Sequence, residues 1–167
     1  MFAGKTQELI RRIRLATIAR QKVQVFKHGI DKRYAKDFVV SHDLLKIPSI
    51  PLTRPPDILK RVSPDTDVVG IDEVHFFPPE IVDVCEGLAD SGRRVIVAGL
   101  DQDYRGVPFD PMASLLARAE YVTKNLAICV VCGNPANRSQ RVGAGKRRIE
   151  VGHTDKYEAR CRRCFKP

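Results

Sequence analysis

Gly4, Lys5 and Thr6, near the start of the chain, have the residue types and the order that bind phosphate groups. They come directly before residues 7–20, where apolar side chains recur at helical spacing, so the triplet would lie at a helix N-terminus. Backbone N–H groups around Gly4 would then face a polyphosphate, Lys5 would reach its β- and γ-phosphates, and the Thr6 hydroxyl would bind Mg²⁺. The triplet alone occurs by chance, and its position at a helix start is what favours a phosphate-binding loop.

Two acids, Asp72 and Glu73, follow an apolar stretch over residues 67–71 that predicts a buried strand. A carboxylate at the C-terminal end of a parallel strand lies in the crevice where such sheets bind ligands. Asp72 is suited to hold the hydration shell of Mg²⁺, and Glu73 is suited to act as a general base on a water or an acceptor hydroxyl. The alternative is that Glu73 is simply solvated beyond the strand end.

Four of the five cysteines form two CxxC pairs separated by 28 residues, namely Cys129, Cys132, Cys161 and Cys164. Four thiolates in two such pairs are typical of a tetrahedral zinc site, and they leave no open coordination position. We therefore predict a structural zinc ion. Cys85 lies on the apolar face of a predicted helix and is expected in the core.

The apolar patterns predict strands that alternate with helices as far as residue 128. Strands are predicted at 23–27, 67–71, 94–100 and 121–128, and helices at 7–20, 79–90 and 110–118. The proline-rich residues 46–66 predict an irregular crossing with at most a short helix near 57–61. Strands that are apolar on both faces indicate an α/β fold with a parallel sheet between helices. The composition changes at Cys129, so we predict two domains, residues 1–128 and 129–167.

The net charge of +9 is concentrated in the C-terminal part, where residues 129–167 hold ten of the 29 basic residues and three of the 20 acidic ones. Such a region favours an anionic partner, either nucleic acid, nucleotide phosphates or an acidic surface. The longest apolar runs, such as 95–100, are far shorter than the ~20 residues of a membrane helix, which argues against a membrane protein. Paired CxxC motifs without a hydrophobic leader favour a cytoplasmic location.

Taken together, these motifs resemble the thymidine kinases of the cellular, zinc-containing type, and the resemblance runs from end to end. It also rests on residues 72–77 (Asp-Glu-Val-His-Phe-Phe), on Leu100-Asp101-x-x-Tyr104 with Pro108-Phe109 downstream, and on Gly152 with Asp155-Lys156-Tyr157 before the second cysteine pair. The resemblance implies a P-loop NTPase-like parallel sheet flanked by helices. It also implies a small C-terminal zinc-ribbon domain whose lasso covers the nucleoside.

The function implied by the resemblance is transfer of the ATP γ-phosphoryl group to the 5′-hydroxyl of thymidine in pyrimidine salvage and DNA precursor synthesis, with deoxyuridine as a second candidate substrate. Glu73 corresponds to the catalytic base. The implied ATP and Mg²⁺ site comprises Gly4, Lys5, Thr6, Asp31, Arg33, Asp72 and His75. The implied nucleoside site comprises Met1, Phe76, Leu100, Tyr104, Phe109, Ser139, Val151, Gly152 and Tyr157. The resemblance further implies a homotetramer and feedback inhibition by thymidine triphosphate.

Two departures from the family pattern stand out. His75 replaces the Gln of many relatives, and it retains the capacity to donate and accept hydrogen bonds. The full loop pattern GxxxxGKT would place its first Gly two positions before Met1, so we expect Met1 to be internal and the functional protein to begin roughly 10–25 residues earlier.

Two alternatives remain open from the residues themselves. The basic C-terminal region is compatible with a zinc-ribbon module that binds nucleic acid on an NTPase core. The incomplete loop is compatible with an inactive chain that folds only by joining an oligomer.

Overall fold

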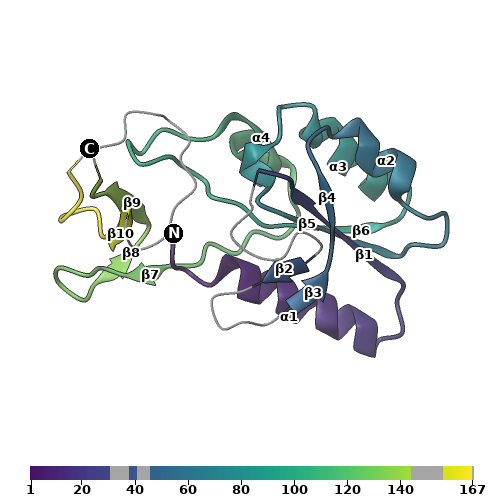
Figure 1. The fold of residues 1–167 in the computed structure, drawn as a ribbon, viewed down its shortest axis with the longest axis horizontal. Helices are drawn as coiled ribbons and strands as arrows, with labels where there is room; N and C mark the ends of the chain where they lie inside the picture. Colours follow the sequence, from purple (N-terminus) through teal and green to yellow (C-terminus); the bar gives the residue numbers. More distant parts are fainter. Residues whose placement is uncertain (31–37, 41–45, 144–155, 167) are drawn as a thin grey trace.

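The computed structural model describes residues 1–30, 38–40, 46–143 and 156–166. The molecule is elongated, with a sheet and its helices at one end and several short hairpin strands at the other (Figure 1). The first residue lies between these two ends, close to the hairpins.

The main sheet has four strands in the order β4-β1-β5-β6, and every neighbouring pair is parallel. These strands are β1 (Val23–His28), β4 (Ile50–Leu52), β5 (Val68–Asp72) and β6 (Arg94–Val97). The order brings β1 and β5 together at the centre, with Lys27 opposite Asp72 at their C-terminal ends. The predicted parallel α/β sheet is therefore confirmed.

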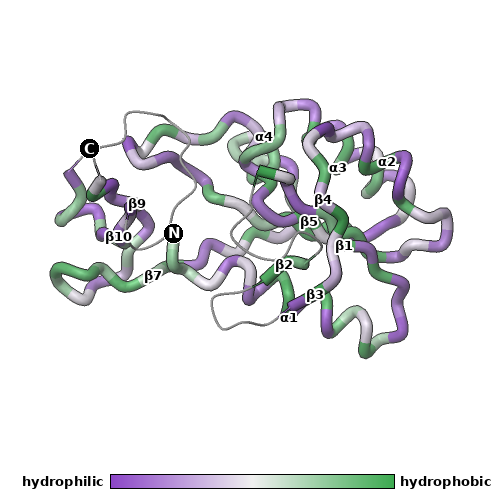
Figure 2. Tube along the Cα trace, viewed as in Figure 1, coloured by the Kyte–Doolittle hydropathy of each residue, from purple (hydrophilic) through white to green (hydrophobic). Residues whose placement is uncertain are grey.

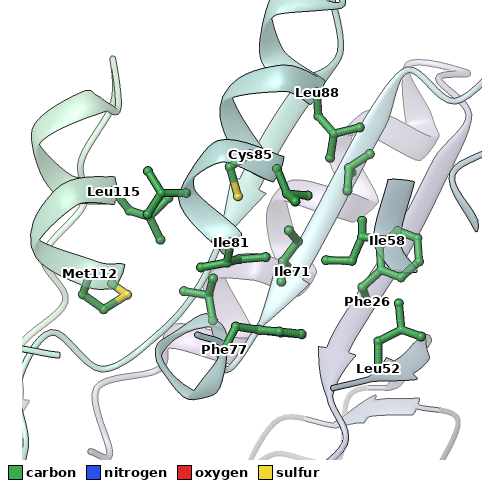
Figure 3. Packing of buried hydrophobic residues seen from close by; sticks show 14 of the residues in the cluster. Phe26, Leu52, Ile58, Ile71, Phe77, Ile81, Cys85, Leu88, Met112 and Leu115 are labelled. Carbon is green, nitrogen blue, oxygen red and sulfur yellow. The ribbon is translucent and has the colours of Figure 1, made fainter. Parts of the chain in front are cut away.

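Helices cover both faces of this sheet (Figure 1). One face packs against α1 (Lys5–Ile18), and the other packs against α2 (Pro56–Arg61), α3 (Ile81–Asp90) and α4 (Asp110–Arg118). The side chains of β5 alternate accordingly, because Val68 joins the α1 cluster whereas Val69 and Ile71 join the cluster of α3 and α4. Figure 3 shows α3 contributing Ile81, Cys85 and Leu88 to the second cluster. All five residues of β5 are buried, as expected for a central strand covered on both faces.

Gly70 allows α1 to approach β5 closely. A Cβ atom at this position would lie 3.0 Å from Ile13 Cδ1 and 3.4 Å from Val25 Cγ2. Absence of a side chain on this face of β5 thus accommodates the Ile13 side chain of the covering helix.

The prediction of a strand at 121–128 is wrong for most of these residues. Only Ala127–Ile128 forms a strand, β7, and it pairs antiparallel with β8 (Pro135–Ala136) and does not join the parallel sheet. Residues 121–126 have no regular structure, and the Tyr121 side chain is 87% exposed. Apolar and β-branched residues favour a strand only where a neighbouring strand accepts their hydrogen bonds, and within the described residues none pairs with 121–126.

Three short strands fall in and around the proline-rich crossing. They are β4 of the main sheet and the antiparallel pair of β2 (Phe38–Val40) and β3 (Lys46–Pro48). The predicted short helix near 57–61 is present as α2, and β6 ends at Val97, three residues before the predicted end of that strand.

The C-terminal part is built from the β7–β8 pair and from β9 (Arg138–Arg141), which pairs antiparallel with β10 (Tyr157–Arg160). A small cluster of Ala127, Ala136, Ala159 and two of the cysteines forms its interior, and Phe2 and Ala3 pack against it. The turn beyond β7 is apolar (Figure 2), and Val130 and Val131 there are exposed.

Candidate active site

The loop at the start of α1 is shaped by Gly4, which has a left-handed backbone with φ of 68°. A Cβ at this position would lie 2.9 Å from Gln7 Oε1, so both the backbone angle and the available space favour glycine. Gly4 is the N-cap residue of α1, and as a glycine it has no side chain that could cap the helix. The first-turn N–H groups, next to Lys5 and Thr6, form the positive end of the helix dipole, which attracts anions.

Thr6 is linked directly to the acidic end of β5. Its Oγ1 donates a hydrogen bond to Asp72 Oδ2 at 3.2 Å, and the Glu73 backbone N–H donates to Asp72 Oδ1 at 2.9 Å. Asp72 is buried, and burial raises the pKa of its carboxyl to about 7, with the charge of Glu73 adding to the shift and the two hydrogen bonds and Lys5 opposing it. The Asp72 carboxyl and the Thr6 hydroxyl thus place oxygen atoms, the ligands that Mg²⁺ prefers, side by side.

Glu73 begins the 3₁₀ turn η1 (Val74–Phe76) with a left-handed backbone, φ 51° and ψ 38°. This conformation is unusual for a residue with a side chain, and such strain is concentrated at functional sites. The Glu73 side chain is 13% exposed, and its Oε2 lies 3.6 Å from His75 Nδ1. The carboxylate is thus held at the edge of the sheet and is still reachable from outside.

His75 is fully buried among apolar groups beside Glu73. Its Nδ1 accepts a hydrogen bond from the Leu100 N–H at 3.2 Å. The His75 ring lies 4.0 Å from the Phe76 ring and 4.8 Å from the Phe109 ring, measured between centroids. The structure therefore brings together three residues of the implied nucleoside site around His75, and it places His75 against the predicted base.

A second group of implied nucleoside residues lies where β9 and β10 meet the segment after β6. The Met1 amino group donates to Ser139 Oγ at 2.7 Å, and Ser139 belongs to β9. Tyr157, in β10, accepts a hydrogen bond at its hydroxyl from Arg141 Nη2 at 2.7 Å. The Arg141 guanidinium also lies 3.8 Å from the centre of the Tyr104 ring.

The Sγ atoms of Cys129, Cys132, Cys161 and Cys164 all lie within 4.8 Å of one another, and no disulfide joins them. The Sγ of Cys132 is 3.6 Å from that of Cys161 and 3.6 Å from that of Cys164. Sulfurs around a tetrahedral zinc ion at ~2.3 Å are about 3.8 Å apart, so these positions fit zinc. The Asn134 side chain donates to Cys132 Sγ at 3.3 Å, and N–H groups of Asn134 lower the pKa of the Cys132 thiol, which favours the thiolate that binds metal.

Comparison with known proteins agrees with this arrangement. A model of the thymidine kinase family matches residues 1–165. A thymidine kinase from Rhodothermus sp. (strain ITI 518) is 56% identical over 167 residues, which are 100% of this chain and 78% of the relative. A thymidine kinase from Bdellovibrio bacteriovorus is 54% identical over the same length, covering 82% of the relative. The chain belongs to the thymidine kinase family.

Membership of the thymidine kinase family confirms the resemblance seen in the sequence. The individual roles of the site residues stay predictions, although the structure brings Thr6, Asp72, Glu73 and His75 together. Four of the implied residues, Asp31, Arg33, Val151 and Gly152, lie outside the described residues.

Sequence reasoning missed two residues that border the site of this thymidine kinase family member. His28 is the last residue of β1, and the centre of its half-buried ring lies 4.7 Å from that of Phe77 and 5.9 Å from that of Phe76. Burial lowers the pKa of His28, and the charge of Glu73 opposes this shift in part. Arg141 belongs to no motif that singles it out in the sequence. The C-terminal ends of parallel strands meet at one edge of the sheet, so the position of His28 at the end of a predicted strand was a usable signal.

Among the helices of the described residues, none has the length and apolar character needed to cross a membrane.

Proposed function

We propose that this chain transfers the γ-phosphoryl group of ATP to the 5′-hydroxyl of thymidine and releases dTMP and ADP, with deoxyuridine as a second substrate. The observation on which this rests is the juxtaposition of Thr6, Asp72 and Glu73 at the edge of the sheet in a member of the thymidine kinase family.

The phosphate side of the reaction is assigned to the N-terminus of α1. Its first-turn N–H groups would bind phosphate oxygens, and Lys5 would neutralise charge on the β- and γ-phosphates. Thr6 and Asp72 would hold the Mg²⁺ that arrives with ATP, and that ion supplies further neutralisation of the phosphate charge. Phosphoryl transfer needs mainly positioning and charge stabilisation, and these residues provide both.

The acceptor side is assigned to Glu73, which would orient the 5′-hydroxyl and accept its proton during transfer. His75 accepts a hydrogen bond at Nδ1 from the Leu100 N–H, which fixes the orientation of its ring beside Glu73, with Nδ1 3.6 Å from Glu73 Oε2. Rings of Phe76 and Phe109, which contact His75, would exclude water from the reacting atoms.

The four cysteines would hold a structural zinc ion, which organises the strands of the C-terminal part and takes no part in the chemistry. We place the boundary between the nucleotide-binding and zinc-binding domains near residue 128, as predicted. The family resemblance further suggests a cytoplasmic homotetramer that thymidine triphosphate inhibits. Gel filtration with light scattering and an inhibition series with the triphosphate would test the last two points.

The nucleic-acid alternative is weakened by the contacts of the basic residues. Arg138 donates from Nη1 to Gln102 Oε1 at 2.5 Å, and Arg141 is occupied between Tyr104 and Tyr157. Side chains used in this way within the chain contribute less to a free basic surface.

The direct test is ADP release from Mg·ATP in the presence and absence of thymidine, with dTMP identified as the second product. We expect release that depends on thymidine and matches the dTMP formed. Folded protein that binds ATP and yet gives no thymidine-dependent ADP would contradict the proposal.

A further inference from the structure

Arg141 lies between two tyrosines from distant parts of the chain. Its guanidinium carbon is 3.8 Å from the centre of the Tyr104 ring, and its Nη2 donates to the Tyr157 hydroxyl at 2.7 Å. The same carbon is 5.4 Å from the centre of the Tyr157 ring. A guanidinium at 3.8 Å from a ring centre is in close stacking contact, well inside the ~6 Å range of cation–π interactions.

The backbone determines how these three residues meet. Tyr157 and Arg141 are directly opposite each other in the β9–β10 ladder, where paired side chains are close neighbours. Tyr104 comes from the segment after β6, which extends from the sheet toward the hairpins (Figure 1). Arg141 is therefore a link between the C-terminal part and the α/β part of the molecule.

This link is separate from a neighbouring one. Gln102 Nε2 donates to the Asn137 carbonyl at 2.9 Å, and Gln102 Oε1 accepts from Arg138. A Cβ on Gly106 would lie 2.7 Å from Arg138 Nη1, so that guanidinium also packs closely on the segment after β6. Since these contacts hold the segment to β9 without Arg141, loss of Arg141 would change the orientation of the two rings more than the attachment of the segment.

A buried tyrosine needs a hydrogen-bond partner for its hydroxyl, and a ring bordering a binding site must be held at a fixed angle to stack on a planar ligand. Tyr157 is 6% exposed, and Arg141 provides a charged donor to its hydroxyl. The planar guanidinium can stack on Tyr104 and donate to Tyr157 at once, which a lysine ammonium cannot do as well.

We propose that Arg141 is a positioning residue for nucleoside binding, which fixes the Tyr104 and Tyr157 rings so that they accept the planar pyrimidine base. This inference rests on the proposed function and deepens it, because it assigns part of the nucleoside affinity to a residue that acts through its neighbours. Arg141 affects the thymidine side of the reaction and leaves the ATP side largely unchanged.

The test compares R141M, R141K and R105M with the unmutated chain. Arg105 is the matched control because its guanidinium carbon also lies over the Tyr104 ring, at 5.7 Å, but its side chain is bound to Asp103 of the same segment. We expect the KM for thymidine to rise about tenfold in R141M, about threefold in R141K and less than about twofold in R105M. The KM for ATP, kcat and zinc content should stay within about twofold in all three variants.

A purely structural role would instead lower Tm and kcat, with the KM for thymidine unchanged. That result, or an equal rise of this KM in R141M and R105M, overturns the proposal. Calorimetric titration with thymidine separates the two levels of inference. If the unmutated chain binds thymidine without turnover, the proposed function fails, and weaker binding by R141M still supports the positioning role. If the unmutated chain does not bind thymidine, both proposals fail.

Discussion

Asp72 and Glu73 are neighbours in the chain, yet the fold gives their carboxylates different surroundings. Asp72 is buried and accepts hydrogen bonds from the Thr6 hydroxyl and from the Glu73 N–H. Glu73 turns out of β5 with a left-handed backbone, and its side chain stays partly exposed beside His75. A carboxylate fixed by two donors is suited to a cation, and one that a substrate can reach is suited to proton transfer. These different environments support the different roles that we propose for the two acids.

Replacing Glu73 by Gln should separate binding from chemistry. The amide keeps the size of the side chain but cannot accept the proton of the 5′-hydroxyl. We expect kcat to fall at least about 100-fold, with the Kd for ATP changed less than about threefold. Steady-state kinetics and calorimetry measure the two quantities, and Glu120→Gln, at an exposed position, is the control. Near-normal turnover in the Glu73 variant would remove it from the role of base.

Asp72 should make the Mg²⁺-free protein less stable as the pH rises. Its pKa is raised from 3.8 to about 7 in the folded state, so the folded state resists ionisation of this carboxyl. The protein therefore loses stability as the pH rises from about 4 to about 7. Asn stays neutral and avoids this loss. We expect the stability advantage of Asp72→Asn to widen by roughly 2–3 kcal/mol between pH 5 and pH 8.

The measurement for Asp72 is chemical unfolding at both pH values, in buffer without Mg²⁺ and without a chelator that would remove zinc. If the Asp72→Asn variant exceeds the unmutated chain in stability by the same amount at both pH values, or is less stable than it at pH 8, then burial does not suppress the ionisation of Asp72.

Helix α3 shows how two glycines in similar space differ through backbone conformation alone. Local backbone aside, a Cβ atom at Gly87 or at Gly92 would meet no atom of the described residues within 4 Å. Gly87 lies within the helix, whereas Gly92 follows it with φ of 85°. We expect Gly87→Ala to stabilise the protein by about 0.5–1 kcal/mol and Gly92→Ala to destabilise it by about 1 kcal/mol. Urea unfolding of the two variants checks this, and changes of the same sign would contradict it.

The elements that could be predicted from the sequence are those with a strong local pattern. The buried strand β5 and the helices α1, α3 and α4 have apolar periodicity and clear boundaries, and they form within a few residues of their predicted positions. Strand β4 was missed because Pro51 lies within it, although a proline is tolerated at the edge of a sheet. Residues 121–126 were assigned to a strand from composition, which does not reveal whether a neighbouring strand is present.

At the level of the whole molecule, the residues of the candidate site also divide into those that a local motif reveals and those that only tertiary packing brings together. Gly4, Lys5 and Thr6, the Asp72–Glu73 pair and the two cysteine pairs are contiguous motifs, so their chemistry could be predicted from spacing. The contact of Arg141 with Tyr104 and Tyr157 could not be predicted in this way. It depends on how the β9–β10 hairpin packs against the segment after β6, which is distant in the sequence: Gln102 and Arg138, which join the same two elements, are 36 residues apart. Pairings of this kind depend on tertiary packing and leave no periodic signal in the sequence.

The cysteine cluster should control thymidine binding although it lies outside the reacting groups. Strand β10 runs from Tyr157 to Arg160 and leads directly to Cys161, so the position of Tyr157 depends on how that end of the strand is held. We expect the chain to contain about one zinc ion and the Cys161→Ser variant to lose it. In that variant the KM for thymidine should rise at least about tenfold, and the Kd for ATP should change less than about threefold.

Metal analysis, kinetics and calorimetry measure these quantities. Cys85→Ala is the control, because Cys85 lies on the buried face of α3, in a different hydrophobic cluster from the four cysteines, and this variant should keep its zinc. Equal loss of ATP and thymidine binding in the Cys161 variant would mean instead that zinc supports the fold as a whole.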